Sequence, residues 1–339
     1  MKLQFKLAGS IAACILVLIL GIGIGSVFVP PQDIIKIIFS KITQKEIYGI
    51  ESTFVAIVWN VRLPRVLVAF LAGGSLAVSG AVMQSILKNP LASSYTMGVS
   101  SGAALGAALV ILTGFTLPLI PAFTLPFAGT IAGLLTVYAS VKVASLVDRN
   151  FENSTIILTG IVFSLFINGI ITIIIALNRD GMARLIFWQM GSFASQNIKN
   201  FNILLPVCAA ATLILTSLSH EMDLLTFGEE QAKTMGLNTK KIKWLLLFLA
   251  SALTGTVISF VGIIGFIDLI SPHIVRKLVG ARHKIVIPVS FCIGGTAMVL
   301  CDMTARTILS PQELPVGAIT ALAGAPFFCY VYFKGRRRA

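Results

Sequence analysis

Ten apolar runs follow one another along this chain, and they constrain its fold more than any other feature. A helix that crosses a lipid bilayer needs about 20 consecutive apolar residues. The runs cover 7–29, 65–87, 95–113, 121–147, 155–177, 200–219, 244–267, 271–280, 285–309 and 315–333. Segment 271–280 is too short to cross alone. The sequence therefore predicts an all-α integral membrane protein with about ten transmembrane helices.

Composition excludes several other classes of protein. Hydrophobic residues make up 56% of the 339 residues and charged residues 12%, whereas soluble domains carry about 25% charged residues. A soluble enzyme and a disordered chain are excluded because there is too little polar surface to face water. The five cysteines stand singly within apolar runs, which is typical of small buried side chains rather than disulfides.

Basic residues lie mostly between the apolar runs, where they set orientation in the membrane. The net charge of +13 therefore does not indicate nucleic-acid binding. If the runs alternate across the membrane from a cytoplasmic start, most of the 26 lysines and arginines fall on the cytoplasmic side. This bias predicts that both termini are cytoplasmic and that residues 1–339 form a single transmembrane domain.

Three stretches do not read as membrane spans. Residues 30–64 follow the first helix (7–29), and the mixture of isoleucines and lysines in their first half predicts an extracytoplasmic interfacial segment. Residues 178–199 form a second non-spanning stretch. Residues 220–243 are the most polar part of the chain and predict water-exposed helix and turn.

Two further patterns concern helix packing and symmetry. Small residues recur four positions apart, as in Gly102–Gly106 and Gly129–Gly133, and this spacing favours close contact between helices in lipid. Helix 65–87 ends at Asn89-Pro90, and helix 244–267 is followed by Ser271-Pro272. The two would run in opposite directions, which is typical of transporters built from inverted repeats.

Motifs for catalysis are absent from the sequence. There is no phosphate-binding G-x-x-x-x-G-K-[ST] loop, so this chain is not expected to hydrolyse nucleotide. His220, His273 and His283 do not have the spacing of metal ligands. We therefore predict no catalytic residue, no bound cofactor and no metal site.

Four groups of residues resemble the FecCD-type permeases, the membrane subunits of ABC importers for iron chelates and cobalamin. The first group is Arg62–Arg65, Ser79–Gln84, Asn89–Ala92 and Gly98–Gly106. The second is Gly228–Ala232 with Met235–Leu237, and the third is Gly265-Phe266, Pro272–Arg276 and Gly280. The fourth is Asp302–Arg306, Glu313–Gly317 and Gly324–Phe327. Their order and spacing extend the resemblance from about Arg62 to Lys334.

The resemblance implies a ten-helix permease subunit in the cytoplasmic membrane that works as one of a pair. Its partners would be a second permease subunit, identical or paralogous, two cytoplasmic ATPase subunits that bind ATP and Mg²⁺, an extracytoplasmic substrate-binding protein, and membrane lipid. Nucleic acid is not an expected partner.

The resemblance also implies roles for particular residues. Cytoplasmic coupling helices at 223–237 would contact the ATPases through Asp223, Gly228, Glu229, Glu230, Ala232, Met235, Gly236 and Leu237. The binding protein would dock at Arg62, Arg65 and Arg306. Asn89, Leu91, Ser154 and Thr155 would form the cytoplasmic gate of the translocation path.

The cargo implied by this resemblance is a ferric siderophore, with cobalamin or haem as alternatives. One departure from the family pattern is Asp268, which stands where the family usually has glycine and whose role the sequence leaves open. Asp302 and Arg306, four residues apart, can pair on one helix face. A transporter driven by an ion gradient is the alternative from another class, since it would use an unpaired membrane carboxylate such as Asp268.

Overall fold

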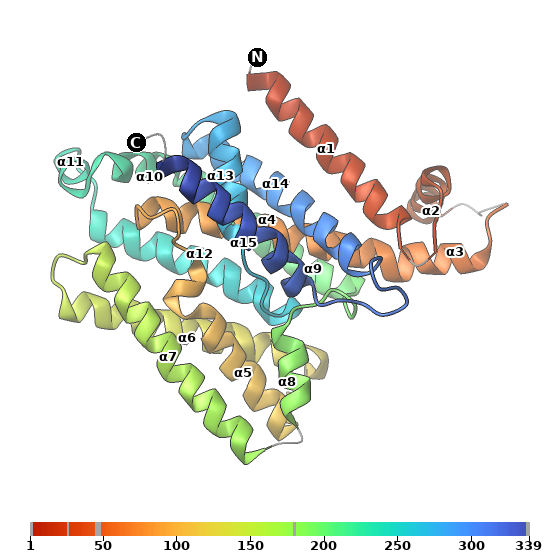
Figure 1. The fold of residues 1–339 in the computed structure, drawn as a ribbon, viewed down its shortest axis with the longest axis horizontal. Helices are drawn as coiled ribbons and strands as arrows, with labels where there is room; N and C mark the ends of the chain where they lie inside the picture. Colours follow the sequence, from red (N-terminus) through yellow and green to blue (C-terminus); the bar gives the residue numbers. More distant parts are fainter. Residues whose placement is uncertain (1–2, 26, 45–48, 179–180, 337–339) are drawn as a thin grey trace.

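The fold is described by a computed structural model that covers residues 3–25, 27–44, 49–178 and 181–336. These residues form helices and connecting turns, and no strand occurs among them (Figure 1). The first half contains α1 (Leu3–Gly23), α2 (Pro31–Thr43), α3 (Ser52–Ala56), the π-helix η1 (Ile57–Arg62), α4 (Leu63–Ile86), the 3₁₀ turn η2 (Ser94–Met97), α5 (Val99–Thr113), the 3₁₀ turn η3 (Pro121–Phe123), α6 (Thr124–Val147) and α7 (Asn153–Leu177). The second half contains α8 (Met182–Gln189), α9 (Ile198–Ser217), α10 (Ser219–Phe227), α11 (Glu229–Thr234), α12 (Thr239–Val261), α13 (Ile267–Val279), α14 (His283–Ala305) and α15 (Val316–Arg336).

Each of the ten apolar runs contains a helix. Among the described residues, six helical stretches are long and apolar enough to cross a membrane, and α1, α5 and α15 contain shorter apolar stretches. The run 244–267 is interrupted, because α12 ends at Val261 and a turn with Phe266 in the left-handed region precedes α13. The 13 residues of α13 span about 20 Å at 1.5 Å per residue, so this helix is too short to cross alone, as predicted.

The helix that contains α4 begins well before the predicted boundary at residue 65. Helical structure is continuous from Ser52 to Ile86, so the second half of the predicted interfacial segment 30–64 belongs to this long helix. Pro64 lies within it and lacks an N–H, and the wider π-helical turns of η1 come immediately before. Residues 31–43 form α2, which has apolar and polar faces as expected for the interface.

Helix α4 forms the centre of the molecule and packs most extensively against α14. Glycines allow this close approach: a Cβ added to Gly73 would lie 2.3 Å from the carbonyl oxygen of Gly294. A Cβ on Gly102 would similarly lie 2.7 Å from the carbonyl oxygen of Ala132, where α5 meets α6. The small residues identified in the sequence therefore mark helix contacts.

Helices α5 to α8 form a second group beside α12 (Figure 1). Helix α7 lies on the outside of this group, and only 17% of its most apolar 18-residue window is buried. The corresponding share for the helix containing α4 is 89%. Most of the surface of α7 is therefore free to contact lipid or another subunit.

The short helices lie at the two ends of the molecule. Helices α10 and α11 lie at the end shown on the left of Figure 1, together with the end of α4 and the start of α7. Helices α2 and α3 lie at the opposite end. The predicted cytoplasmic termini fall on residues 1–2 and 337–339, which lie outside the described residues, as do residue 26 and residues 45–48 of the segments 7–29 and 30–64.

Candidate functional site

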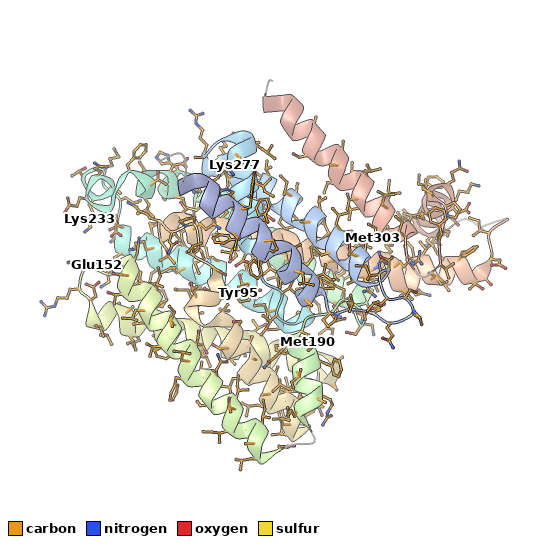
Figure 2. All side chains as sticks on the ribbon, in the orientation of Figure 1. Tyr95, Glu152, Met190, Lys233, Lys277 and Met303 are labelled. Carbon is orange, nitrogen blue, oxygen red and sulfur yellow. The ribbon has the colours of Figure 1, made fainter. Side chains whose placement is uncertain are left out.

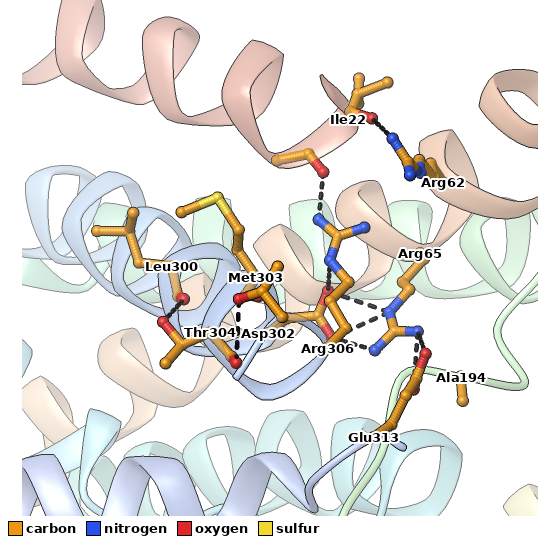
Figure 3. A network of polar contacts seen from close by, with 12 residues as sticks. Ile22, Arg62, Arg65, Ala194, Leu300, Asp302, Met303, Thr304, Arg306 and Glu313 are labelled. Carbon is orange, nitrogen blue, oxygen red and sulfur yellow. Dashed lines mark hydrogen bonds and ion pairs between the residues drawn. The ribbon is translucent and has the colours of Figure 1, made fainter. Parts of the chain in front are cut away.

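A network of buried charges connects α4, α14 and α1 at the end of the molecule near α2 and α3. Arg65 donates to Asp302 at 2.7 Å and to Glu313 at 2.8 Å (Figure 3). Arg306 lies 3.7 Å from Asp302, as the four-residue spacing predicted. Asp302 is fully buried, and its charge is balanced by these two arginines.

Arg306 and a third arginine, Arg62, bind the carboxyl end of α1. Arg62 donates to the carbonyl oxygens of Ile22, at 3.0 Å, and Gly23, at 2.8 Å. Arg306 donates to the carbonyl oxygen of Gly21. The last carbonyls of a helix have no partner within the helix and carry partial negative charge, so guanidinium groups stabilise them.

All three predicted docking residues are thus engaged within the chain. Arg62, Arg65 and Arg306 are 5%, 5% and 6% exposed. They nevertheless line a pocket of about 270 Å³ with Gly25, Ser310 and Glu313. A docking partner would reach these guanidinium groups through this pocket, and their role in docking remains a prediction.

The predicted coupling segment 223–237 contains two short helices, α10 and α11. Gly228 joins them with φ of 130°, and Gly236 ends α11 with φ of 86°, conformations that other residues adopt with strain. Ala232 is buried and Leu237 is half-buried, so these two residues attach the segment to the bundle.

Two carboxylates predicted to contact the ATPases also bind residues of the bundle. Asp223 lies 2.5 Å from Nδ1 of His283 and accepts the backbone N–H of the same residue at 3.1 Å, at the start of α14. Glu229 forms an ion pair with the buried Lys243 at 2.8 Å. Glu230 and Met235 are exposed, so the segment has an anchored side and an open side.

The four predicted gate residues lie where α4 ends and where α7 begins. The side chain of Asn89 accepts the backbone N–H of Leu91 at 2.9 Å, which forms a tight turn after α4. Leu91 is 42% exposed. Ser154 is exposed and Thr155 half-buried in the first turn of α7. The end of α4 and the start of α7 lie at the end of the molecule that carries α10 and α11 (Figure 1).

A polar cluster that the sequence analysis did not identify surrounds the segment after Leu91. Ser93 donates to the buried carboxylate of Asp268. The hydroxyl of Tyr95 donates to the carbonyl oxygen of Ile264 at 2.6 Å, near the middle of the molecule (Figure 2). Asp268 therefore helps to hold the segment 93–97 against α13. The only sign of this role in the sequence was that aspartate stands at position 268, where the family usually has glycine.

A metal centre is not formed by the residues that the structure describes, since no group of three or more histidine, cysteine, aspartate or glutamate side chains gathers there.

Helix α7 carries three exposed polar residues on its uncovered side, which is otherwise apolar. Ser154, Asn168 and Thr172 are exposed there, together with the apolar Leu158 and Leu165. An exposed asparagine is costly in hydrocarbon because its amide has no hydrogen-bond partner there. This face suits a water-filled path better than a surface that contacts only lipid.

The FecCD transport family matches residues 13–334 of this chain. An uncharacterised ABC transporter permease of Bacillus subtilis, YvrB, is 38% identical over 94% of this chain and 91% of the relative. The cobalamin import permease BtuC of Halobacterium salinarum is 36% identical over 84% of this chain and 75% of the relative. The Fe(3+)-citrate import permease YfmE of Bacillus subtilis is 33% identical over 98% and 96%.

A solved structure extends this similarity to the whole fold. It is a metal-chelate type ABC transporter in an inward-facing conformation, with 28% identity and a TM-score of 0.83 over 98% of this chain and 100% of the other. The family match and the structural similarity both extend over nearly the whole chain. This chain belongs to the FecCD transport family.

Proposed function

We propose that this chain is the permease subunit of a binding-protein-dependent ABC importer that moves a ferric siderophore across the cytoplasmic membrane. The observation that carries the proposal is the open side of the segment 223–237. Phe227 and Met235 are 67% and 61% exposed on the most polar part of the chain. Apolar side chains in such a place suit insertion into a partner protein.

The anchored side of the segment would allow contact with the ATPase to move the bundle. Asp223 and Glu229 bind α14 and α12, so α10 and α11 are fastened to the bundle on one side and open on the other. An ATPase that closes around ATP and Mg²⁺ would push on the open side. The push would tilt the bundle as a rigid body and open the path on the opposite face.

The path itself would lie between two permease subunits. The exposed polar residues of α7 support this placement, because they need either water or a second protein surface beside them. Ser154 and Thr155 would lie at the cytoplasmic end of that path, near the turn formed by Asn89 and Leu91. The bulky cargo would pass these small side chains without binding tightly.

The binding protein would dock at the opposite end, near α2 and α3. Three guanidinium groups and one partly exposed carboxylate line the pocket there. Their excess positive charge supports docking of an acidic side chain from the binding protein, since complementary charge fixes the register of two surfaces.

An iron chelate is favoured as cargo because relatives carry ferric-citrate names, and the name of another refers to cobalamin. The test is uptake of radiolabelled ferric siderophores, ferric citrate, haem and cobalamin by a deletion strain and its complemented parent, with and without ATP depletion. Loss of ATP-dependent uptake of one ferric siderophore is expected. Loss of cobalamin or haem uptake would overturn the cargo. Uptake that survives ATP depletion but requires the proton gradient would contradict the ABC mechanism.

A further inference from the structure

One buried ammonium group connects three elements at the end of the molecule that carries α11. The Nζ of Lys243, on α12, donates to the carboxylate of Glu229 at 2.8 Å and to the carbonyl oxygen of Phe151 at 2.8 Å. The Lys243 side chain is 1% exposed. It therefore joins the first residue of α11 to the turn between α6 and α7.

The turn that receives Lys243 is held in place by its own contacts. Phe151 is 1% exposed, its backbone is left-handed with φ of 56°, and its ring centroid lies 5.3 Å from the Lys243 Nζ. The carboxylate of Asp148 accepts the backbone N–H groups of Glu152, at 2.7 Å, and Asn150, at 2.9 Å. These hydrogen bonds lower the pKa of Asp148, and the bond from Glu152 has the largest effect. The carboxylate therefore stays ionised at neutral pH.

The turn leads directly into α7. Asn153 begins that helix two residues after Phe151, and Ser154 and Thr155 follow in its first turn. Figure 2 shows Glu152 and Lys233, from the turn and from α11, at the same end of the molecule. A continuous series of contacts thus runs from α11 through Glu229, Lys243 and Phe151 to the start of α7.

We propose that Lys243 is a positioning residue that transmits movement of α11 to the first turn of α7. The proposal rests on the function proposed above, in which an ATPase moves α11. Breaking this pair would leave the ammonium group of Lys243, whose side chain is 1% exposed, without its carboxylate partner, which is strongly unfavourable. The three elements therefore move together when α11 is displaced.

If Lys243 only stabilised the fold, it would make the same contacts. The test must therefore report movement as well as stability. We would purify the full transporter with its ATPase in lipid nanodiscs. Hydrogen–deuterium exchange at residues 153–160 would be compared without nucleotide and with ATP plus vanadate. The variants are Lys243→Met, Glu229→Ala and Lys243→Arg. The arginine variant can still donate to both Glu229 and the carbonyl oxygen of Phe151. The matched control is Lys241→Met, an exposed lysine on the same helix.

We expect all variants to retain the ATPase, because Lys243 is buried and the exposed residues Phe227, Glu230 and Met235 are unchanged in every variant. The change in exchange caused by nucleotide should be lost in Lys243→Met and Glu229→Ala. It should persist in Lys243→Arg and Lys241→Met. Should Lys243→Met not fold, Glu229→Ala and Lys243→Arg still make the comparison.

A Lys243→Met or Glu229→Ala transporter that responds to nucleotide as the wild type does would overturn the proposal. Loss of the ATPase from Glu229→Ala would also overturn it, since Glu229 would then act on the partner directly. If the wild-type chain itself does not retain the ATPase, the proposed function fails, and this inference fails with it. If the wild-type chain retains the ATPase, the variants test the role of Lys243 separately from the proposed function.

Discussion

Arg65 shows how a charged residue is accommodated inside this protein. Its guanidinium group is shared between Asp302, which is fully buried, and Glu313, which is 40% exposed. The three charges come from positions 65, 302 and 313, so they meet only when the helices have packed. The network is therefore a property of the folded bundle rather than of any one helix.

We predict that Arg65→Ala destabilises the protein by about 3–5 kcal/mol, because Asp302 would keep its burial and lose its main partner. Thermal unfolding in detergent, followed by size-exclusion chromatography, measures this change. The control is Lys36→Ala, which removes a surface pair with Asp33 whose lysine is 66% exposed. An exposed pair contributes about 0–1 kcal/mol. Equal effects of the two substitutions would contradict the role given to the network.

Asp268 is the residue whose role the sequence left open. Ser93 donates to its carboxylate, and the amide of Gln84 donates to its backbone carbonyl at 3.4 Å. Asp268 is 3% exposed. It therefore acts as a buried acceptor that holds the segment following the predicted gate, a role for which glycine has no side chain.

Removing the donor to Asp268 should be costly. We predict that Ser93→Ala lowers stability by about 1–3 kcal/mol, since a buried acceptor would lose its partner. The comparison is Ser145→Ala, whose exposed hydroxyl bonds only within its own helix and whose loss should change stability by less than about 0.5 kcal/mol. Differential scanning fluorimetry would separate the two. A neutral effect of Ser93→Ala would show that Asp268 does not need this donor.

At the scale of elements, hydropathy located the helices well but misplaced some of their ends. Helical structure continues from Ser52 to Ile86, whereas the sequence analysis ended the interfacial segment at residue 64. Arg62, Pro64 and Arg65 look like a boundary because charged residues and proline usually lie outside a span. Their partners, at positions 22, 23, 302 and 313, are far away in the sequence and cannot be identified from local pattern.

Helices and turns occupy the polar stretch 220–243 as predicted, but the direction of the side chains in the segment 223–237 was not predictable. A short polar helix gives no local signal for which of two adjacent glutamates faces inwards. Glu229 is turned towards the bundle by Lys243, and Asp223 by His283, both on other helices. Small residues, in contrast, did predict where helices touch, because only a small side chain permits that distance.

The contact between α4 and α14 supplies a prediction at this scale. A Cβ at Gly73 would lie 2.3 Å from both the carbonyl oxygen of Gly294 and the Cβ of Met298. Gly73→Ala should therefore force the two helices apart and destabilise the protein by about 1–3 kcal/mol. The control is Gly9→Ala in α1, where nothing lies within 4 Å and helix propensity alone favours alanine. The ratio of folded to aggregated protein after heating reports the difference. A Gly73→Ala variant as stable as Gly9→Ala would mean that α4 and α14 can separate slightly at little cost in stability.

At the scale of the whole molecule, the helices differ in how well they are covered. The most apolar window is 89% buried in the helix containing α4 and 61% buried in α12, whereas it is only 17% buried in α7, which leaves one wide face of α7 open. If that face lines a path between two subunits, water reaches it, while equally exposed residues elsewhere contact lipid.

Thiol chemistry distinguishes these two surroundings. In a background with Cys329→Ser, we expect Asn168→Cys to react with a charged, water-soluble maleimide more than about tenfold faster than Leu213→Cys. A thiol in hydrocarbon does not form the reactive thiolate. Leu213 lies on α9 and is 70% exposed, so it serves as the lipid-facing reference. Equal rates at the two positions would exclude a water-filled path along α7.

The open face of α7 also bears on how the transporter is produced. A newly inserted copy without a partner would present the side-chain amide of Asn168 to hydrocarbon, where its polar groups are poorly satisfied. Such an orphan is less stable than a paired copy and more exposed to degradation, since binding stabilises the bound form by mass action. The abundance of finished transporters would then follow the scarcest subunit, and surplus synthesis of this chain alone would raise its turnover rather than its amount.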